Sequence, residues 1–238
     1  MKLDILAIGI HPDDVELSCA GTLLKHIEQG KKVGILDLTQ GELGSRGSGK
    51  LRLVEAANAA KILGISVREN LGFADGFFTN DKTHQLEIIK IIRKYQPTVI
   101  LSNAPSDRHP DHGRASKLIS DACFYAGLLK VETTLNGVNQ EKWRPKAIYN
   151  YIQDRYLNPD FVVDVTPFVA TKIESIKAYA SQFHNPTSTE PETPISGAKF
   201  FDFIKARMMT FGRDIGVDYA EGFIAERVVG VEDIMTLK

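Results

Sequence analysis

The sequence predicts an α/β fold of the Rossmann-like type, in which a mostly parallel sheet carries helices on both faces. Strand-like and helix-like segments alternate through the first half of the chain, and this alternation is typical of parallel sheets with right-handed crossovers. The chain has 238 residues, of which 43% are hydrophobic, which is enough for one large domain with a buried core.

The elements of the first half follow from local patterns. Short apolar runs predict strands, whereas apolar residues at helical spacing predict helices that end at Gly30, at Gly64 or before Pro97. The strands are expected at residues 5–10, 32–38, 67–71 and 98–101, and the helices at residues 15–29, 51–63, 86–95 and 115–129.

The pattern is looser after residue 129. The same criteria predict strands at residues 146–152, 161–165 and 222–231, and helices at residues 171–182 and 200–211. We expect one domain over 1–238, with a Rossmann-like core at 1–130 and a segment at 131–238 that completes the sheet and the substrate pocket. The proline-rich loop at 184–194, which begins with His184, is a possible lid over that pocket.

Composition argues against several classes of protein. Lys and Arg number 29 against 30 Asp and Glu, so the chain lacks the basic excess expected of a nucleic-acid-binding protein. No stretch approaches the ~18 apolar residues of a membrane span, and the short N-terminal apolar run does not resemble a signal peptide. We therefore expect a cytoplasmic protein with no nucleic-acid or membrane partner.

Two polar motifs follow the first and fourth predicted strands. Residues 11–14 are His-Pro-Asp-Asp, and residues 108–112 are Arg-His-Pro-Asp-His. In the usual doubly wound order these two strands are neighbours, and ligands bind in the crevice beyond their carboxyl ends. The sequence therefore predicts an active site at the C-terminal ends of strands one and four. A dinucleotide fingerprint is absent from the first strand–helix turn, which argues against NAD binding.

The motifs contain a candidate metal-ligand set. His11 and Asp14 are spaced to face one point across a single turn, and His112 can complete the set from the neighbouring loop. A catalytic zinc takes three such ligands and leaves one position open. Two histidines and a carboxylate also suit Fe²⁺, so both Zn²⁺ and Fe²⁺ stay open at this point.

The remaining polar residues of the motifs suit hydrolysis. Asp13 is a candidate general base, and His109 is a candidate oxyanion stabiliser that Asp111 could orient. The competing interpretation is that Asp14 and Asp111 are ordinary helix caps. Similar chemistry in two loops that should meet favours the metal site.

The motifs at 11–14 and 109–112 resemble those of the LmbE/PIG-L-like zinc deacetylases, which are Rossmann-like enzymes that N-deacetylate GlcNAc-containing substrates. The likeness extends over nearly the whole chain and includes Gly21-Thr22, Thr39-Gln40-Gly41-Glu42, Arg46-Gly47, Ser181-Gln182-Phe183, Glu192-Thr193 and Tyr219-Ala220-Glu221-Gly222-Phe223. This combination resembles the bacillithiol-pathway subgroup, whose substrate is N-acetylglucosaminyl malate.

The resemblance implies a role for each motif residue. His11, Asp14 and His112 correspond to the zinc ligands, Asp13 to the general base, and His109, backed by Asp111, to the oxyanion stabiliser. The resemblance also implies a small amino-sugar substrate and assembly into trimers or hexamers.

Arg52 and Arg108 are implied by the resemblance to lie near the substrate, where they could grip the malyl carboxylates. The alternatives are a solvated helix residue for Arg52 and a loop salt bridge for Arg108. Other GlcNAc conjugates and chitooligosaccharides stay open as substrates. A non-haem iron enzyme and a non-catalytic binding module are less favoured alternatives, because neither explains Asp13 beside the ligands.

Overall fold

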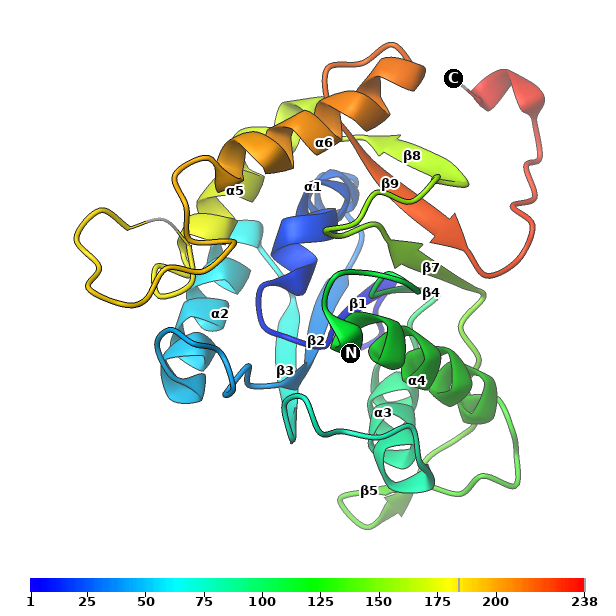
Figure 1. Cartoon of the computed structure of the whole chain (residues 1–238). Coiled ribbons are helices and arrows are strands. Elements are labelled where there is room, and N and C mark those ends of the chain that lie inside the picture. Colours follow the sequence, from blue (N-terminus) through cyan, green and yellow to red (C-terminus); the bar gives the residue numbers. More distant parts are fainter. Residues whose placement is uncertain (184, 238) are drawn as a thin grey trace.

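The computed structural model of the chain describes residues 1–183 and 185–237 (Figure 1). Its centre is a seven-stranded sheet in the order β3-β2-β1-β4-β7-β9-β8. The strands are β1 (Ile5–Gly9), β2 (Val33–Thr39), β3 (Val67–Phe73), β4 (Val99–Ser102), β7 (Ala147–Tyr151), β8 (Phe161–Asp164) and β9 (Ala220–Ala225). The expected mixed α/β fold with a mostly parallel sheet is confirmed.

The first five strands of this order pair in parallel, whereas β9 runs in the direction opposite to its two neighbours. β1 pairs with β2 on one side and with β4 on the other, in parallel register in both cases. β4 pairs in parallel with β7, whereas β9 runs antiparallel to both β7 and β8. The carboxyl ends of β1 and β4 therefore lie side by side at the centre of the sheet.

Helices cover both faces of the sheet (Figure 1). They are α1 (Asp14–Glu28), α2 (Gly49–Leu63), α3 (Lys82–Tyr95), α4 (Pro110–Ala126), α5 (Val169–Lys177) and α6 (Phe200–Asp214). One core lies between the sheet and α3 with α4, a second lies between the sheet and α1, and a third apolar cluster lies among α1, α2, α5 and α6. The strands at the centre, β1 and β2, are buried on both faces, as expected for a covered parallel sheet.

Several element boundaries differ from the sequence expectation. The last strand, expected at 222–231, ends at Ala225, and Val228, Val229 and Val231 are exposed beyond it. α5 ends at Lys177 rather than at residue 182. α4 begins five residues earlier than expected, because Pro110 occupies the first helical turn, where its missing N–H costs nothing.

A short hairpin was not expected from the sequence. β5 (Thr134–Leu135) and β6 (Val138–Asn139) pair around Asn136 and Gly137, which both have positive φ. Asn-Gly is a strong signal for such a turn, but the flanking strands are too short for the periodicity to be recognised. The described residues also include two short 3₁₀ segments, Thr166–Phe168 and Ile234–Thr236. None of the helices in the described ranges is both long and apolar enough to cross a membrane.

Candidate active site

A cavity of about 300 Å³ opens where the loops after β1 and β4 meet. The cavity is lined by every candidate site residue proposed from the sequence except Asp111. These lining residues are His11, Asp13, Asp14, Arg52, Arg108, His109 and His112. Asp111 lies directly behind this wall, and its side chain is 1% exposed. The two motifs are therefore brought together from positions about 100 residues apart in the chain.

The loop after β1 has an unusual backbone at Asp13. This residue precedes α1 and has a φ of 118°, a backbone angle that residues other than glycine rarely adopt. Such conformations persist only where the surroundings enforce them. Asp14 begins α1 directly after it, so the strained residue sets the directions of two neighbouring carboxylates.

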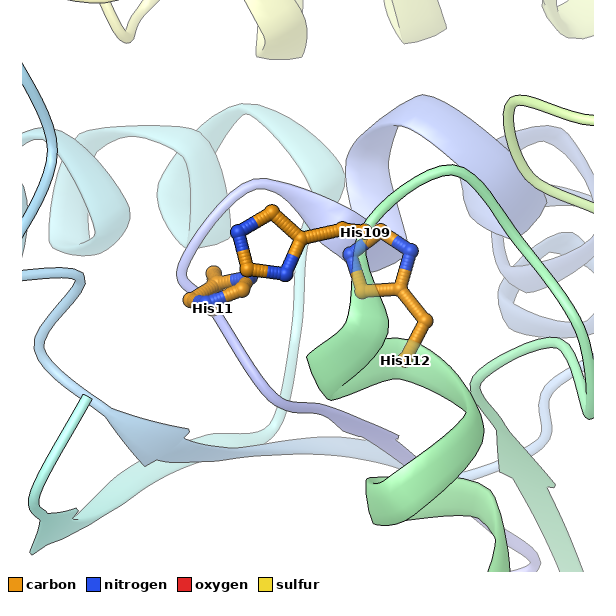
Figure 2. Close-up of side chains that lie close together, drawn as sticks. All are labelled: His11, His109 and His112. Atoms are coloured by element: carbon orange, nitrogen blue, oxygen red, sulfur yellow. The ribbon is translucent and has the colours of Figure 1, made fainter. Parts of the chain in front are cut away.

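The loop after β4 leads into α4, and the two histidines of the motif lie at the start of this helix. His109 is the N-cap of α4, and its Nδ1 accepts a hydrogen bond from the backbone N–H of Asp111 at 3.3 Å. His112 follows one turn later. Figure 2 shows the imidazoles of His109 and His112 facing that of His11 from the neighbouring loop, with ring centroids of His11 and His109 4.8 Å apart.

Asp14 lies between the two proposed ligand histidines. Its Oδ1 is 3.3 Å from His112 Nε2, and its Oδ2 is 3.8 Å from His11 Nδ1. All three side chains are buried. Two imidazoles and one carboxylate at these separations are a donor set that suits a divalent cation of the zinc or ferrous type, so the residues present fit the implied metal.

The same region contains two alternative sets of ligand atoms. His11, His109 and His112 each place a nitrogen within 4.8 Å of the others, and so do His11, Asp75 and Asp111 with a nitrogen and two carboxylate oxygens. His11 belongs to both sets. Together they show that the cavity wall carries more potential ligands than one cation requires.

Two buried aspartates that the sequence analysis missed contact the two histidines proposed as ligands. Asp107 Oδ2 is 2.5 Å from His112 Nδ1, on the ring edge opposite Asp14. Asp75 Oδ1 is 3.0 Å from His11 Nε2, again opposite the nitrogen that faces Asp14. A carboxylate on the far nitrogen fixes the tautomer and orientation of a metal-binding histidine. The sequence signal that could have identified Asp75 and Asp107 is their position shortly after β3 and β4.

Two side-chain amides hold the carboxylate of Asp14. Asn103 donates to its Oδ2 at 2.9 Å, and Gln153 donates to its Oδ1 at 2.5 Å. The backbone N–H of His11 is a third donor, at 2.9 Å from Oδ2. Asp14 therefore uses its side chain to receive these bonds rather than to cap α1, and the helix-cap interpretation of Asp14 is wrong.

The charges in this cluster shift the pKa values of its members. Burial alone would lower the pKa of His11, but hydrogen bonds to Asp111 and Asp75 and the charge of Asp14 raise it to about 10. Burial would also lower the pKa of His112, but Asp14 and Asp107 raise it to about 9. Burial favours a protonated Asp14, yet His112 and His11 hold its pKa far below the usual range. The carboxylates around His11 and His112 therefore favour the protonated form of both imidazoles.

Asp13 has the pKa expected of a general base. Burial raises the pKa of its carboxyl to about 7, against the opposing charge of Arg52. Arg52 Nη1 lies 3.5 Å from Asp13 Oδ2 and also donates to the carbonyl of Pro12 at 3.2 Å. A third contact joins Arg52 to Gln182.

The two arginines proposed for substrate binding have different surroundings. Arg52 is 6% exposed, so its interpretation as a solvated helix residue is wrong. Arg108 is half exposed and pairs with Asp154, which is the loop salt bridge considered as its alternative. Both still border the cavity.

The geometry around Asp111 differs from the proposed backing of His109. Asp111 Oδ1 is 3.9 Å from His109 Nδ1, which is beyond hydrogen-bond distance. Its carboxylate pairs instead with Arg114, accepts from the backbone of Gly76 at 3.0 Å and lies 3.6 Å from His11 Nε2. His109 is partly exposed, and burial together with the nearby imidazoles lowers its pKa.

The other histidines lie outside the cavity or outside the described residues. His26 contacts the carbonyl of Thr22, and His84 pairs with Asp81. His184, which the sequence places at the start of the candidate lid, is outside the described residues, so its relation to the cavity stays a prediction.

Comparison with known proteins gives a consistent result. Residues 6–123 match the family model described as "PIG-L: GlcNAc-PI de-N-acetylase". The crystal structure of the conserved protein TT1542 from Thermus thermophilus is 36% identical, with a TM-score of 0.85 over 97% of this chain and 98% of that one. The chain belongs to the PIG-L family. It is therefore an enzyme of the deacetylase type, which hydrolyses N-acetyl amides.

Two curated relatives of the PIG-L chain carry more specific names. A diacetylchitobiose deacetylase of Thermococcus kodakarensis is 27% identical over 92% of this chain and 81% of its own length. A probable N-acetyl-alpha-D-glucosaminyl L-malate deacetylase 2 of Bacillus anthracis is 25% identical over 75% of this chain and 81% of its own length.

The fold by itself does not fix the reaction. The 4-carboxy-2-hydroxymuconate hydratase GalB of Pseudomonas putida KT2440 shares the fold at 22% identity, with a TM-score of 0.79 over 98% of this chain and all of GalB. The reaction must therefore be argued from the site.

Proposed function

We propose that the chain is a metal-dependent hydrolase that removes the acetyl group from an N-acetylglucosaminide. The observation that supports this most strongly is the meeting of His11, Asp14 and His112 in one cavity, with Asp13 beside them. A buried carboxylate with a pKa of about 7 next to a metal-ligand set is suited to activating water. A binding protein needs no such base.

Each residue has a defined task in the proposed reaction. His11, Asp14 and His112 hold the divalent cation, proposed as Zn²⁺ with Fe²⁺ as the alternative. When bound, the cation supplies Lewis acidity that polarises the acetamide carbonyl and lowers the pKa of water. Asp13 accepts a proton from the attacking water, and Arg52 holds the Asp13 carboxylate in position.

His109 stabilises the negative charge that develops on the acetamide oxygen. The backbone N–H of Asp111 occupies Nδ1 of His109, so a neutral imidazole carries its proton on Nε2 and can donate it in a hydrogen bond. Because the pKa of His109 is lowered, we assign the return of the proton to the leaving amine to Asp13. The products are acetate and the free amine.

Two substrates are proposed within this reaction class. N-acetylglucosaminyl malate is favoured by the motif combination and by the similarity to the Bacillus anthracis relative. Diacetylchitobiose is supported equally by the similarity to the Thermococcus kodakarensis relative, which covers more of the chain. Assembly into trimers or hexamers, a cytoplasmic location and a single domain over 1–238 stay predictions.

Amine release tests the proposal directly. The purified protein is incubated with N-acetylglucosaminyl malate, diacetylchitobiose and N-acetylglucosamine, before and after chelation and after addition of Zn²⁺ or Fe²⁺. We expect equal amounts of acetate and amine, loss of activity on chelation, and recovery with one of the two cations. Full activity of a protein shown to be metal-free would contradict the proposal, as would no turnover of any N-acetylglucosaminide by the metal-loaded protein.

A further inference from the structure

Arg207 is a third arginine of the cavity wall, and the motifs give no hint of it. It lies in the middle of α6, the helix that packs along β9 and β8 (Figure 1). Ile204 and Met208, one turn before it and directly after it, are buried. These contacts anchor the helix, so the position of Arg207 on the cavity wall is set by the core.

The guanidinium of Arg207 lacks the carboxylate partner that the other two arginines of the cavity have. Arg52 lies beside Asp13, and Arg108 pairs with Asp154. Across residues 1–183 and 185–237, the single hydrogen bond of Arg207 goes from Nη2 to the carbonyl of Leu17, at 3.2 Å, and no carboxylate is within ion-pair distance. Most of its N–H groups are thus left without a protein acceptor.

The electrostatics agree with this geometry. Burial lowers the pKa of Arg207, and the charges of Asp154, Asp107 and Glu221 offset this effect only in part. Arg207 is partly shielded from water, and a shielded guanidinium without a counter-charge carries an electrostatic cost. An anion delivered by a ligand would relieve this cost, and the planar fork of an arginine suits a carboxylate or phosphate in particular.

We propose that Arg207 selects substrates whose aglycone carries a negative charge, by binding the carboxylate or phosphate of that aglycone in the cavity. This inference rests on the proposed function and narrows its substrate class. Arg207 differs from Arg52, which is engaged by Asp13, and from Arg108, which is half exposed and already paired. It is therefore the arginine of the cavity whose charge is available to a substrate.

The test compares an anionic substrate with a neutral substrate of similar shape, and adds two further N-acetylglucosaminides of different charge. N-acetylglucosaminyl malate is the dicarboxylate substrate, its dimethyl ester is the neutral counterpart, N-acetylglucosamine 1-phosphate tests a phosphate, and diacetylchitobiose tests a neutral sugar. We measure kcat and KM of the metal-loaded enzyme for each, and inhibition by free malate. The wild type is expected to prefer an anionic substrate over its neutral counterpart, and malate is expected to compete with it.

The Arg207→Gln variant is expected to lose this preference. Loss of a charge-assisted contact predicts a KM about 10- to 100-fold higher for the anionic substrate, a much smaller change for the dimethyl ester, and loss of malate inhibition. Arg207→Lys should recover part of the preference, since it keeps the charge. Arg213→Gln, an exposed change on the same helix, is the matched control and should behave as wild type.

Two outcomes would overturn the inference and leave the proposed deacetylase intact. One is a wild-type enzyme with equal kcat/KM for the malate and its dimethyl ester. The other is an Arg207→Gln variant that is folded by thermal denaturation but loses the same factor on both. Failure of every N-acetylglucosaminide would instead contradict the deacetylase itself.

Discussion

At the scale of single residues, the proposed chemistry depends most on Asp13. Replacing it with Asn removes the base but keeps a side chain of nearly the same size. We expect turnover to fall by about 10²- to 10⁴-fold, with the metal retained at wild-type stoichiometry, since His11, Asp14 and His112 are unchanged. Steady-state kinetics with metal analysis of the same sample checks this. An Asn variant with wild-type kcat would remove Asp13 from the mechanism.

Asp107 and Asp75 are expected to act through the histidines they contact. Asp107→Asn leaves His112 with a weaker partner at Nδ1, so metal affinity should fall by about 10- to 100-fold. Asp75→Asn should have a similar effect through His11. Competition with a chromophoric chelator measures the affinity. Asp121→Asn, which alters a partly buried carboxylate of the same helix that pairs with Lys117 and does not border the cavity, is the control.

The raised pKa values of His11 and His112 predict that metal binding releases protons. With pKa values of about 10 and 9, both imidazoles are protonated at pH 7 in the metal-free protein, and a cation binds only the neutral form. About two protons should be released, and the affinity should rise with pH until the pH exceeds both pKa values. Calorimetry in two buffers of different ionisation enthalpy gives the proton count; a value near zero contradicts this assignment.

At the scale of the elements, a buried ion pair joins α1, α5 and β9. Lys172 Nζ lies 2.6 Å from Glu221 Oε1, and Glu221 also accepts from the backbone N–H groups of Gly21 and Thr22. Lys172→Met leaves a buried carboxylate without its cation, which should lower the free energy of unfolding by about 3–5 kcal/mol. Denaturant unfolding measures the change.

The control for this pair is Lys177→Met, which changes an exposed lysine on α5. We expect its free energy of unfolding to stay within about 0.5 kcal/mol of the wild type. A Lys172→Met variant that is as stable as this control would show that the ion pair contributes little to the joint between the three elements.

The elements of the parallel half could be predicted from the sequence, because each has a strong local signal. Buried strands read as continuous apolar runs, and the helices between them end at glycine or before proline. The second half depends more on tertiary context. β9 pairs with β8 as far as Phe223 and with β7 as far as Ala225, and nothing in the valines that follow distinguishes them from a strand.

At the scale of the whole molecule, the sheet order explains why the site could be located in advance. Adjacent parallel strands place the loops at 11–14 and 108–112 together, so residues from both motifs could be predicted to meet. Asp75, Gln153 and Arg207 come from more distant elements and carry no motif. Their proximity results from long-range packing, which a single sequence does not encode in a local pattern.

Metal removal should lower the stability of the entire domain, because the proposed ligands come from two loops that the sheet holds together. A cation present at 100 to 1,000 times its dissociation constant stabilises the folded state by about 3–4 kcal/mol. For a domain of this size that corresponds to a rise in Tm of roughly 6–16 °C. Calorimetry with and without chelator measures it, and an unchanged Tm would argue that the cation is not bound by the folded state.

The backbone of Asp13 has a practical consequence for trapping an enzyme–substrate complex. A φ of 118° is tolerated best by glycine and, among residues with side chains, by asparagine and aspartate. Alanine, the usual choice for a dead mutant, would relax this turn and shift Asp14 along with it, so a crystal of that variant would show a distorted pocket. Soaking experiments should begin from the Asp13→Asn variant, in which the cavity is expected to keep its native shape.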